Sequence, residues 1–204
     1  MVYNPLAILR TLIGIVLGCF AVASMSYGNT LLAIQTVDAA QLDNHLALNE
    51  HLVFLPENEH DQQVTSFIAL ADQPVWQSQG QAIPNLGLGV TPHWFALRLT
   101  NSGSVERSGL LDMSYTMMDY LDVYYISRGE ITVAAEVGDA RPFSVRVLAH
   151  RGFLAPIVIK PGDDVLVLIR AESSGAMRLP LSLWSLEGFF EHEQMSIAPQ
   201  LAFV

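Results

Sequence analysis

Short runs in which apolar and polar residues alternate fill the second half of the chain. The run at 93–100 alternates around Trp94 and ends at Asn-Ser-Gly-Ser, a sequence typical of a turn. Comparable runs, separated by turn residues, lie at 108–115, 120–126, 131–137, 152–159 and 164–172. The gaps between these runs are too short for crossover helices. The pattern therefore predicts an all-β domain, built as a sandwich or a barrel.

Some apolar runs carry more specific information. The run DVLVLIRAE at 164–172 sets valine and isoleucine against leucine, which predicts a strand buried on both faces. RLPLSLW at 178–184 predicts a strand at an edge or with a bulge, because Pro180 cannot donate to a ladder. Residues 52–55 predict a short strand, and residues 67–70 fit either a short strand or the start of a helix.

The N-terminal segment has the features of an export signal. An uncharged apolar run at 11–23 follows Arg10 and ends at an Ala-Val-Ala cleavage motif. Its length suits a signal peptide better than a membrane-spanning helix, which needs about 20 apolar residues. Cys19 gives only a loose match to a lipoprotein signal. The sequence predicts a signal peptide at 1–23, with an uncleaved membrane anchor as the alternative.

The strand pattern stops after Trp184. Residues 186–194 have the composition of a short helix that leaves the domain, and residues 202–204 continue an apolar trend. After the signal peptide we expect a linker at 24–45, a β-sandwich domain at 46–185 and a helical exit segment at 186–204. That segment would lead toward a membrane region.

The charge balance limits the partners. The chain has 10 Lys+Arg and 20 Asp+Glu, with a formal net charge of -10. Nucleic acid is a poor partner, because binding phosphates requires a basic surface. Neutral sugars, cations and cationic peptides remain open. The single cysteine excludes an internal disulfide and a cysteine-based metal site.

The sequence contains no motif for catalysis or for a cofactor. It has no nucleophile elbow, no P-loop and no dinucleotide fingerprint. No two histidines have H-x-H or H-x-x-x-H spacing, and His51 and His60 are better explained as solvated loop residues than as metal ligands. Asp119 and Asp122, three residues apart in a strand, face opposite sides and cannot form a glycosidase pair. We expect a protein that is not an enzyme and holds no cofactor or metal.

One polar stretch, GDARPFSVRVLAHR at 138–151, places three arginines and a histidine in a loop of an acidic chain. Arginine forks suit carboxylates and other planar acceptors, so the stretch could contact a ligand. The arginines could instead brace the loop through backbone carbonyls and nearby carboxylates such as Asp139. Adjacent tyrosines at 124 and 125 face opposite sides of their strand, and an outward ring could stack on a sugar. The candidate ligand-binding residues are Asp139, Arg141, Arg146, His150, Arg151 and Tyr124.

An ordered set of motifs gives the chain a family resemblance. The motifs are W-F-x-L-x-L-T-N at 94–101, D-Y-L-D-V-Y-Y at 119–125, G-D-x-R-P-F-S-x-R at 138–146, H-R-x-F-x-x-P at 150–156 and L-P-L-x-L-W at 179–184. Together they resemble the second type of periplasmic sensor domain of bacterial seven-transmembrane receptors with diverse intracellular signalling modules. The resemblance extends over about residues 46–193.

The resemblance implies a jelly-roll β-sandwich similar to carbohydrate-binding modules. It also implies a periplasmic, inner-membrane-associated sensor of a small-molecule ligand, for which a carbohydrate is the usual proposal. In such receptors membrane helices and a signalling output follow the sensor domain. A homodimer is left open. The alternative is a free carbohydrate-binding or envelope interaction module without a signalling output.

Overall fold

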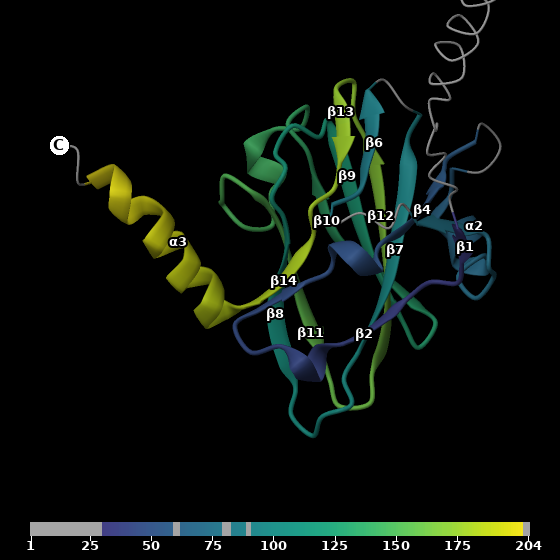
Figure 1. The fold of residues 1–204 in the computed structure, drawn as a ribbon, viewed down its shortest axis with the longest axis horizontal. Coiled ribbons are helices and arrows are strands. Elements are labelled where there is room, and N and C mark those ends of the chain that lie inside the picture. The colour runs from purple at the N-terminus through teal and green to yellow at the C-terminus, as the bar shows by residue number, and fades with distance from the viewer. Residues whose placement is uncertain (1–29, 59–61, 79–82, 89–90, 202–204) are drawn as a thin grey trace, which may run out of the picture.

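Two β-sheets packed face to face form the body of the protein (Figure 1). The computed structural model describes residues 30–58, 62–78, 83–88 and 91–201, so the predicted signal peptide at 1–23 lies outside the described residues. The sandwich confirms the all-β prediction.

The larger sheet contains eight strands. In spatial order they are β1 (Thr30–Leu32), β5 (Trp76–Ser78), β4 (Val53–Pro56), β7 (His93–Thr100), β12 (Asp164–Glu172), β9 (Tyr120–Ser127) and β10 (Glu130–Val137), with β2 (Thr36–Asp38) parallel to β7. The smaller sheet has the order β11 (Phe153–Ile159), β8 (Arg107–Met113), β14 (Ser182–Ser185) and β3 (His45–Ala47). A separate pair joins β13 (Ala176–Arg178) to β6 (Asn85–Leu88).

Five helical segments lie in the part of the chain that the structure describes. They are the 3-10 turns η1 (Ala39–Gln41), η2 (Asn49–His51) and η3 (Phe143–Val145) and the α-helices α2 (Val64–Ala69) and α3 (Leu186–Leu201). Among the described helices, none is long and apolar enough to cross a bilayer.

The main core lies between the two sheets. From β7 to β14, consecutive long strands lie in different sheets, except for the β9–β10 hairpin, whose two strands lie in the larger sheet. The large sheet contributes side chains such as Phe95, Val167 and Ile169, and the small sheet contributes Leu111 and Phe153. Full burial of a side chain of this size contributes about 1.5–3 kcal/mol relative to leaving it exposed.

A second core covers the outer face of the large sheet. The rings of Phe67 in α2 and Trp94 in β7 stack with centroids 4.5 Å apart, and Trp76 and Leu168 belong to the same cluster. Because Val167 belongs to the first core and Leu168 to the second, the predicted two-sided burial of β12 is confirmed.

A buried ion pair closes one end of the second core. Arg170 Nε and Nη2 donate to the two carboxylate oxygens of Glu57 at 2.6 and 2.9 Å. Trp94 Nε1 donates to the same carboxylate at 2.9 Å. These bonds raise the pKa of Arg170 and so stabilise its charged form.

The structure differs from the sequence-based expectation at two segments. The expected linker contains β1 and β2, because Val37 is apolar enough to enter the main core beside β7. The strand expected at 178–184 is divided into β13 and β14, with Pro180 between them. The chain moves there from one pair of strands to another, which suits a residue that has no backbone N–H. At residues 67–70, where the sequence fits either a strand or a helix, the structure has the end of helix α2.

Helix α3 begins directly after β14 and extends away from the sandwich (Figure 1). Its first turn is held by Ser185, whose Oγ accepts a hydrogen bond from the Gly188 N–H at 3.1 Å. Gly188 lies so close to the small sheet that a Cβ there would be 2.5 Å from the Asn44 carbonyl oxygen. Phe189 buries its ring against Leu110 and Leu154. The helical exit segment is thus seated on the sandwich at its base.

Candidate functional site

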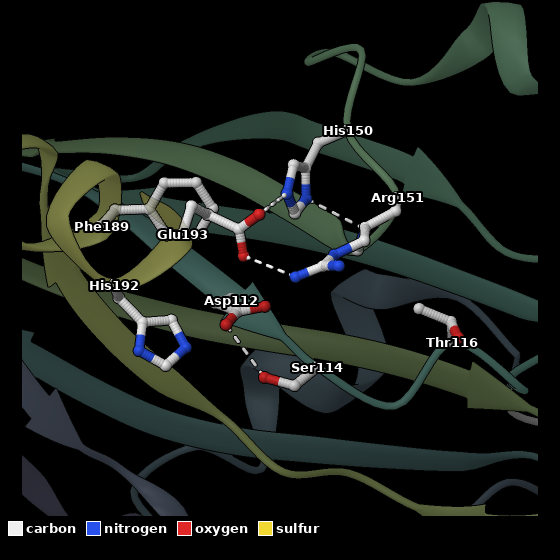
Figure 2. Close-up of a pocket in the computed structure, with 9 residues that line it drawn as sticks. Asp112, Ser114, Thr116, His150, Arg151, Phe189, His192 and Glu193 are labelled. Carbon is white, nitrogen blue, oxygen red and sulfur yellow. Dashed lines mark hydrogen bonds and ion pairs between the residues drawn. The ribbon is translucent and has the colours of Figure 1, made fainter. Parts of the chain in front are cut away.

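A polar cleft of about 370 Å³ lies between the small sheet and α3 (Figure 2). Three separate parts of the chain line it: the end of β8, the segment that precedes β11, and α3. The lining residues are Asp112, Ser114, Thr116, His150, Arg151, Gly152, Phe189, His192 and Glu193. Its volume lies within the range of small-molecule sites.

The strand alternation of β8 points Asp112 into the cleft. Its neighbours Leu111 and Met113 face the main core, so Asp112 faces the outside of the small sheet. Ser114 Oγ donates to Asp112 Oδ2 at 2.9 Å, and this is the single side-chain hydrogen bond to Asp112 within the described chain. Burial raises the pKa of Asp112, although Ser114 and the histidines at 150 and 192 offset part of that effect.

Arg146 holds the second wall in place. Its Nη1 donates to the carbonyl oxygens of His150 and Arg151 at 2.6 and 2.9 Å. Its guanidinium lies over the rings of Phe143 and Phe153, at 4.7 and 4.9 Å from their centroids. Arg146 therefore positions the two residues that enter the cleft and does not itself line it.

The hydrogen bonds of His150 define its tautomer. The Gly152 N–H donates to Nδ1 at 2.9 Å, so Nδ1 is the acceptor and the proton is on Nε2. Nε2 in turn lies 3.2 Å from Glu193 Oε2 and donates to it. The ring therefore links the β11 side of the cleft to α3 (Figure 2).

Helix α3 contributes the third wall through residues on one face. Phe189, His192, Glu193 and Ser196 lie at intervals of three and four residues, which brings them to one side of a helix. Arg151 Nη2 donates to Glu193 Oε1 at 3.1 Å and to Ser196 Oγ at 3.2 Å. Desolvation raises the pKa of Glu193, but the bonds from His150 and Arg151 outweigh it and leave the pKa lowered.

Trp184 separates two histidines beside the cleft. Its ring centroid lies 4.1 Å from that of His45 in β3 and 4.7 Å from that of His192 in α3. His45 Nε2 also lies 3.0 Å from Ser182 Oγ. Burial lowers the pKa of His45, and the nearby His192 lowers it further. The stack joins the small sheet to α3.

The structure divides the six predicted binding residues into two groups. His150 and Arg151 line the cleft, and Arg146 supports them. Arg141 does not line it: its Nη1 lies 2.6 Å from Asp122 Oδ1 and donates to the carbonyl oxygens of Leu121 and Val137. Arg141 thus braces its loop, with Asp122 as its carboxylate partner in place of Asp139.

Asp139 and Tyr124 also lie outside the cleft lining. Asp139 is exposed, and its backbone N–H donates to the Met118 carbonyl at 2.9 Å. Tyr124 stacks on Trp94 in the second core with centroids 5.7 Å apart, while Tyr125 packs against the first core. The predicted opposition of the two tyrosines is confirmed, and the ring of Tyr124 is stacked on that of Trp94.

Sequence reasoning missed several cleft residues: Asp112, Ser114, Thr116, His192 and Glu193. For Asp112 there was a signal, because it is a charged residue between the apolar residues of a predicted strand. His192 and Glu193 follow Phe189 at helical spacing. What the sequence lacked was the position of α3 against β8.

A second cleft of about 430 Å³ lies elsewhere on the molecule, and its charges are paired. Arg98 lies 2.6 Å from Asp72 and 3.3 Å from Asp164, and Arg128 lies 2.5 Å from Asp163. Within the described ranges, no group of three or more acidic, histidine or cysteine side chains is placed to hold a metal ion. The α3 cleft differs from the second one in having a carboxylate, Asp112, with no cationic partner in the described chain.

Comparison with known proteins identifies a family. The family model described as 7TMR-DISM extracellular 2 matches residues 49–185. No curated protein matches the chain. The matched range includes two walls of the cleft, from β8 and from the segment before β11, and ends where α3 begins.

Proposed function

We propose, because the chain belongs to the 7TMR-DISM extracellular 2 family, that it is the periplasmic ligand-sensing domain of a membrane receptor. The family places it among extracellular domains of seven-transmembrane receptors, and the periplasm and a bacterial inner membrane are our inference from that. The observation that carries the proposal is the cleft that the sandwich and α3 form together. We propose this cleft as the ligand site.

The cleft suits a small polar ligand such as a carbohydrate or a related compound. It combines carboxylate, guanidinium, imidazole and hydroxyl groups with the aromatic side chain of Phe189. The Arg151 side chain is 61% exposed, and only its Nη2 donates hydrogen bonds to α3 within the described residues. The remaining N–H groups of its guanidinium can donate to ligand hydroxyls.

The geometry favours binding over hydrolysis. Asp112 and Glu193 are two carboxylates in one cleft, and their pKa values are shifted in opposite directions. With these shifts, Asp112 would be the acid of a glycosidase, and the ionised Glu193 would have to be free to act as nucleophile or base. Both oxygens of Glu193 are engaged, one by His150 and the other by Arg151. This arrangement supports a sensor that is not an enzyme.

Helix α3 supplies a route from the site to the rest of a receptor. A ligand shifts a conformational equilibrium only when it binds the two states with different affinity. Because α3 forms one wall, a ligand that fits the cleft favours the seated helix over a displaced one. The helix extends away from the sandwich, so its displacement would reach beyond the domain (Figure 1).

Thermal denaturation of the full chain against sugars and cell-wall fragments tests the proposal. A ligand at about 100 times its Kd stabilises the folded state by about 2.7 kcal/mol, which raises the Tm by several degrees. We expect Arg151→Asn to abolish the shift.

Arg128→Asn is the matched control, because Arg128 has a φ of 54° that asparagine tolerates and it lies in the other cleft. A shift that survives Arg151→Asn but not Arg128→Asn would move the site to the second cleft. No shift with any compound would contradict a small-molecule sensor.

A further inference from the structure

The charges of the α3 cleft do not balance. With histidines counted as neutral, the cleft holds two carboxylates, Asp112 and Glu193, against the single guanidinium of Arg151. That guanidinium and His150 both bind Glu193. Asp112 receives a hydrogen bond from Ser114 and has no ion pair within the described residues. Asp112 is therefore the carboxylate of the cleft that a cationic group of a ligand could neutralise.

We propose that the ligand of this cleft carries a protonated amine among hydroxyl groups, as an amino sugar with a free amine does, and that Asp112 binds the ammonium. The inference rests on the proposed function and narrows its ligand class.

The half-buried position of Asp112 favours an ammonium over a neutral hydroxyl. A carboxylate that has lost part of its hydration gains more from a charged donor than from a neutral one. Burial raises the pKa of Asp112, which is the expected sign of an ionised form that lacks stabilising partners. The overall charge of -10 also attracts cations toward the surface.

Gly152 keeps the approach to Asp112 open. A Cβ at this position would lie 3.7 Å from Asp112 Oδ1 and 3.2 Å from His150 Nδ1. A larger side chain would therefore grow into the space over the carboxylate. Without it, Oδ1 is left for a ligand while Oδ2 accepts from Ser114.

Groups around Asp112 suit the hydroxyls of such a ligand. The Ser114 hydroxyl uses its proton on Asp112, so its oxygen is an acceptor toward the cleft. Thr116 lines the cleft on the side of β8, and His192 lines it from α3 (Figure 2). An amine flanked by hydroxyls would contact the walls from β8 and α3 at once.

A comparison of glucosamine, glucose and N-acetylglucosamine isolates the contribution of the ammonium group, because the three sugars share one ring. We would measure their affinities for the full chain by calorimetry, at a pH that keeps the glucosamine amine protonated. Glucosamine is expected to bind about tenfold or more tightly than the other two, as one charged hydrogen bond would give. Asp112→Asn preserves the shape of the side chain and is expected to remove this preference. Asp139→Asn is the control, because Asp139 is exposed and outside the cleft lining.

The outcomes distinguish this inference from the proposed function. Equal affinity for the three sugars would contradict the proposed ammonium site and would leave the proposed function as a sensor of neutral sugars. A preference for glucosamine that survives Asp112→Asn would overturn the role of Asp112. If only compounds without an amine bind, the inference fails and the sensor remains. If nothing binds, both fail. The Tm of unliganded Asp112→Asn shows that the variant is folded.

Discussion

Replacing Gly188 with alanine is expected to displace α3 from the sandwich. A Cβ at Gly188 would lie 2.5 Å from the carbonyl oxygen of Asn44, 2.7 Å from its Cβ and 2.9 Å from its carbonyl carbon. Two of these three atoms are backbone atoms of the segment that leads into β3, so they cannot rotate away. The helix must move.

The magnitude follows from two opposed effects. Overpacking of a tight contact costs about 1–3 kcal/mol. Alanine in a helix is better than glycine by at most about 1 kcal/mol, so strain exceeds propensity. Escape by lifting the helix exposes Phe189, which costs about 1.5–3 kcal/mol. We therefore expect a net loss of about 1–2 kcal/mol and, for a domain of this size, a Tm lower by about 2–8 °C.

Tryptophan fluorescence separates displacement of α3 from general loss of stability. Trp184 contacts the ring of His192 on α3, whereas Trp76 and Trp94 are buried in the second core. Gly188→Ala should change the emission of Trp184 in the folded protein and weaken ligand binding. Gly175→Ala is the control, because the nearest atom to its Cβ is Ser173 Oγ at 3.7 Å. If the two variants share one Tm, one emission spectrum and one affinity, α3 is not seated as described.

Three further predictions concern charged groups. Glu57→Ala leaves Arg170 without its buried partner and is expected to cost about 3 kcal/mol in urea denaturation; a loss below about 1 kcal/mol would mean that water replaces the carboxylate. Burial raises the pKa of Asp112 above its ordinary 3.8, so its protonated form stabilises the fold at low pH and that contribution is lost as pH rises through the raised pKa. Asp112→Asn should therefore raise the Tm at neutral pH, with a gain that shrinks as pH falls toward 3.8, and a gain independent of pH would refute this. Arg141→Ala removes donors to two carbonyls and the partner of Asp122; it should lower the Tm and leave ligand affinity unchanged, and an equal loss of both would place Arg141 in the site.

The strands were predictable because local patterns determine them. The alternation around Val167 fixed β12, and the turn at Arg128 and Gly129 fixed the β9–β10 hairpin. The division of the strand at Pro180 was only partly visible. Proline indicates an interrupted ladder. The sequence does not show that the chain passes there from β13, which pairs with β6, to β14 in the small sheet.

The site was less predictable because it depends on contacts between distant segments. The bond between His150 and Glu193 joins residues 43 positions apart, and no local pattern indicates it. The arginines of the loop at 138–151 are prominent in the sequence because the rest of the chain is acidic. In the structure Arg146 donates to backbone carbonyls, and Arg141 donates to carbonyls and pairs with Asp122. Asp112, a single carboxylate in an apolar strand, faces the cleft instead.

The pairing of β14 with β3 also constrains how the domain folds. His45 and Ser182, which meet across these strands, are 137 positions apart. Strand β14 lies between β8 and β3 in the small sheet, so both of these strands lack a neighbour until the chain is complete through residue 185. Closing so long a loop is entropically costly and slows folding. A nascent or partly exported chain would therefore leave the small sheet incomplete until β14 is available, and α3, which follows β14 directly, would take its place on the sandwich only after that.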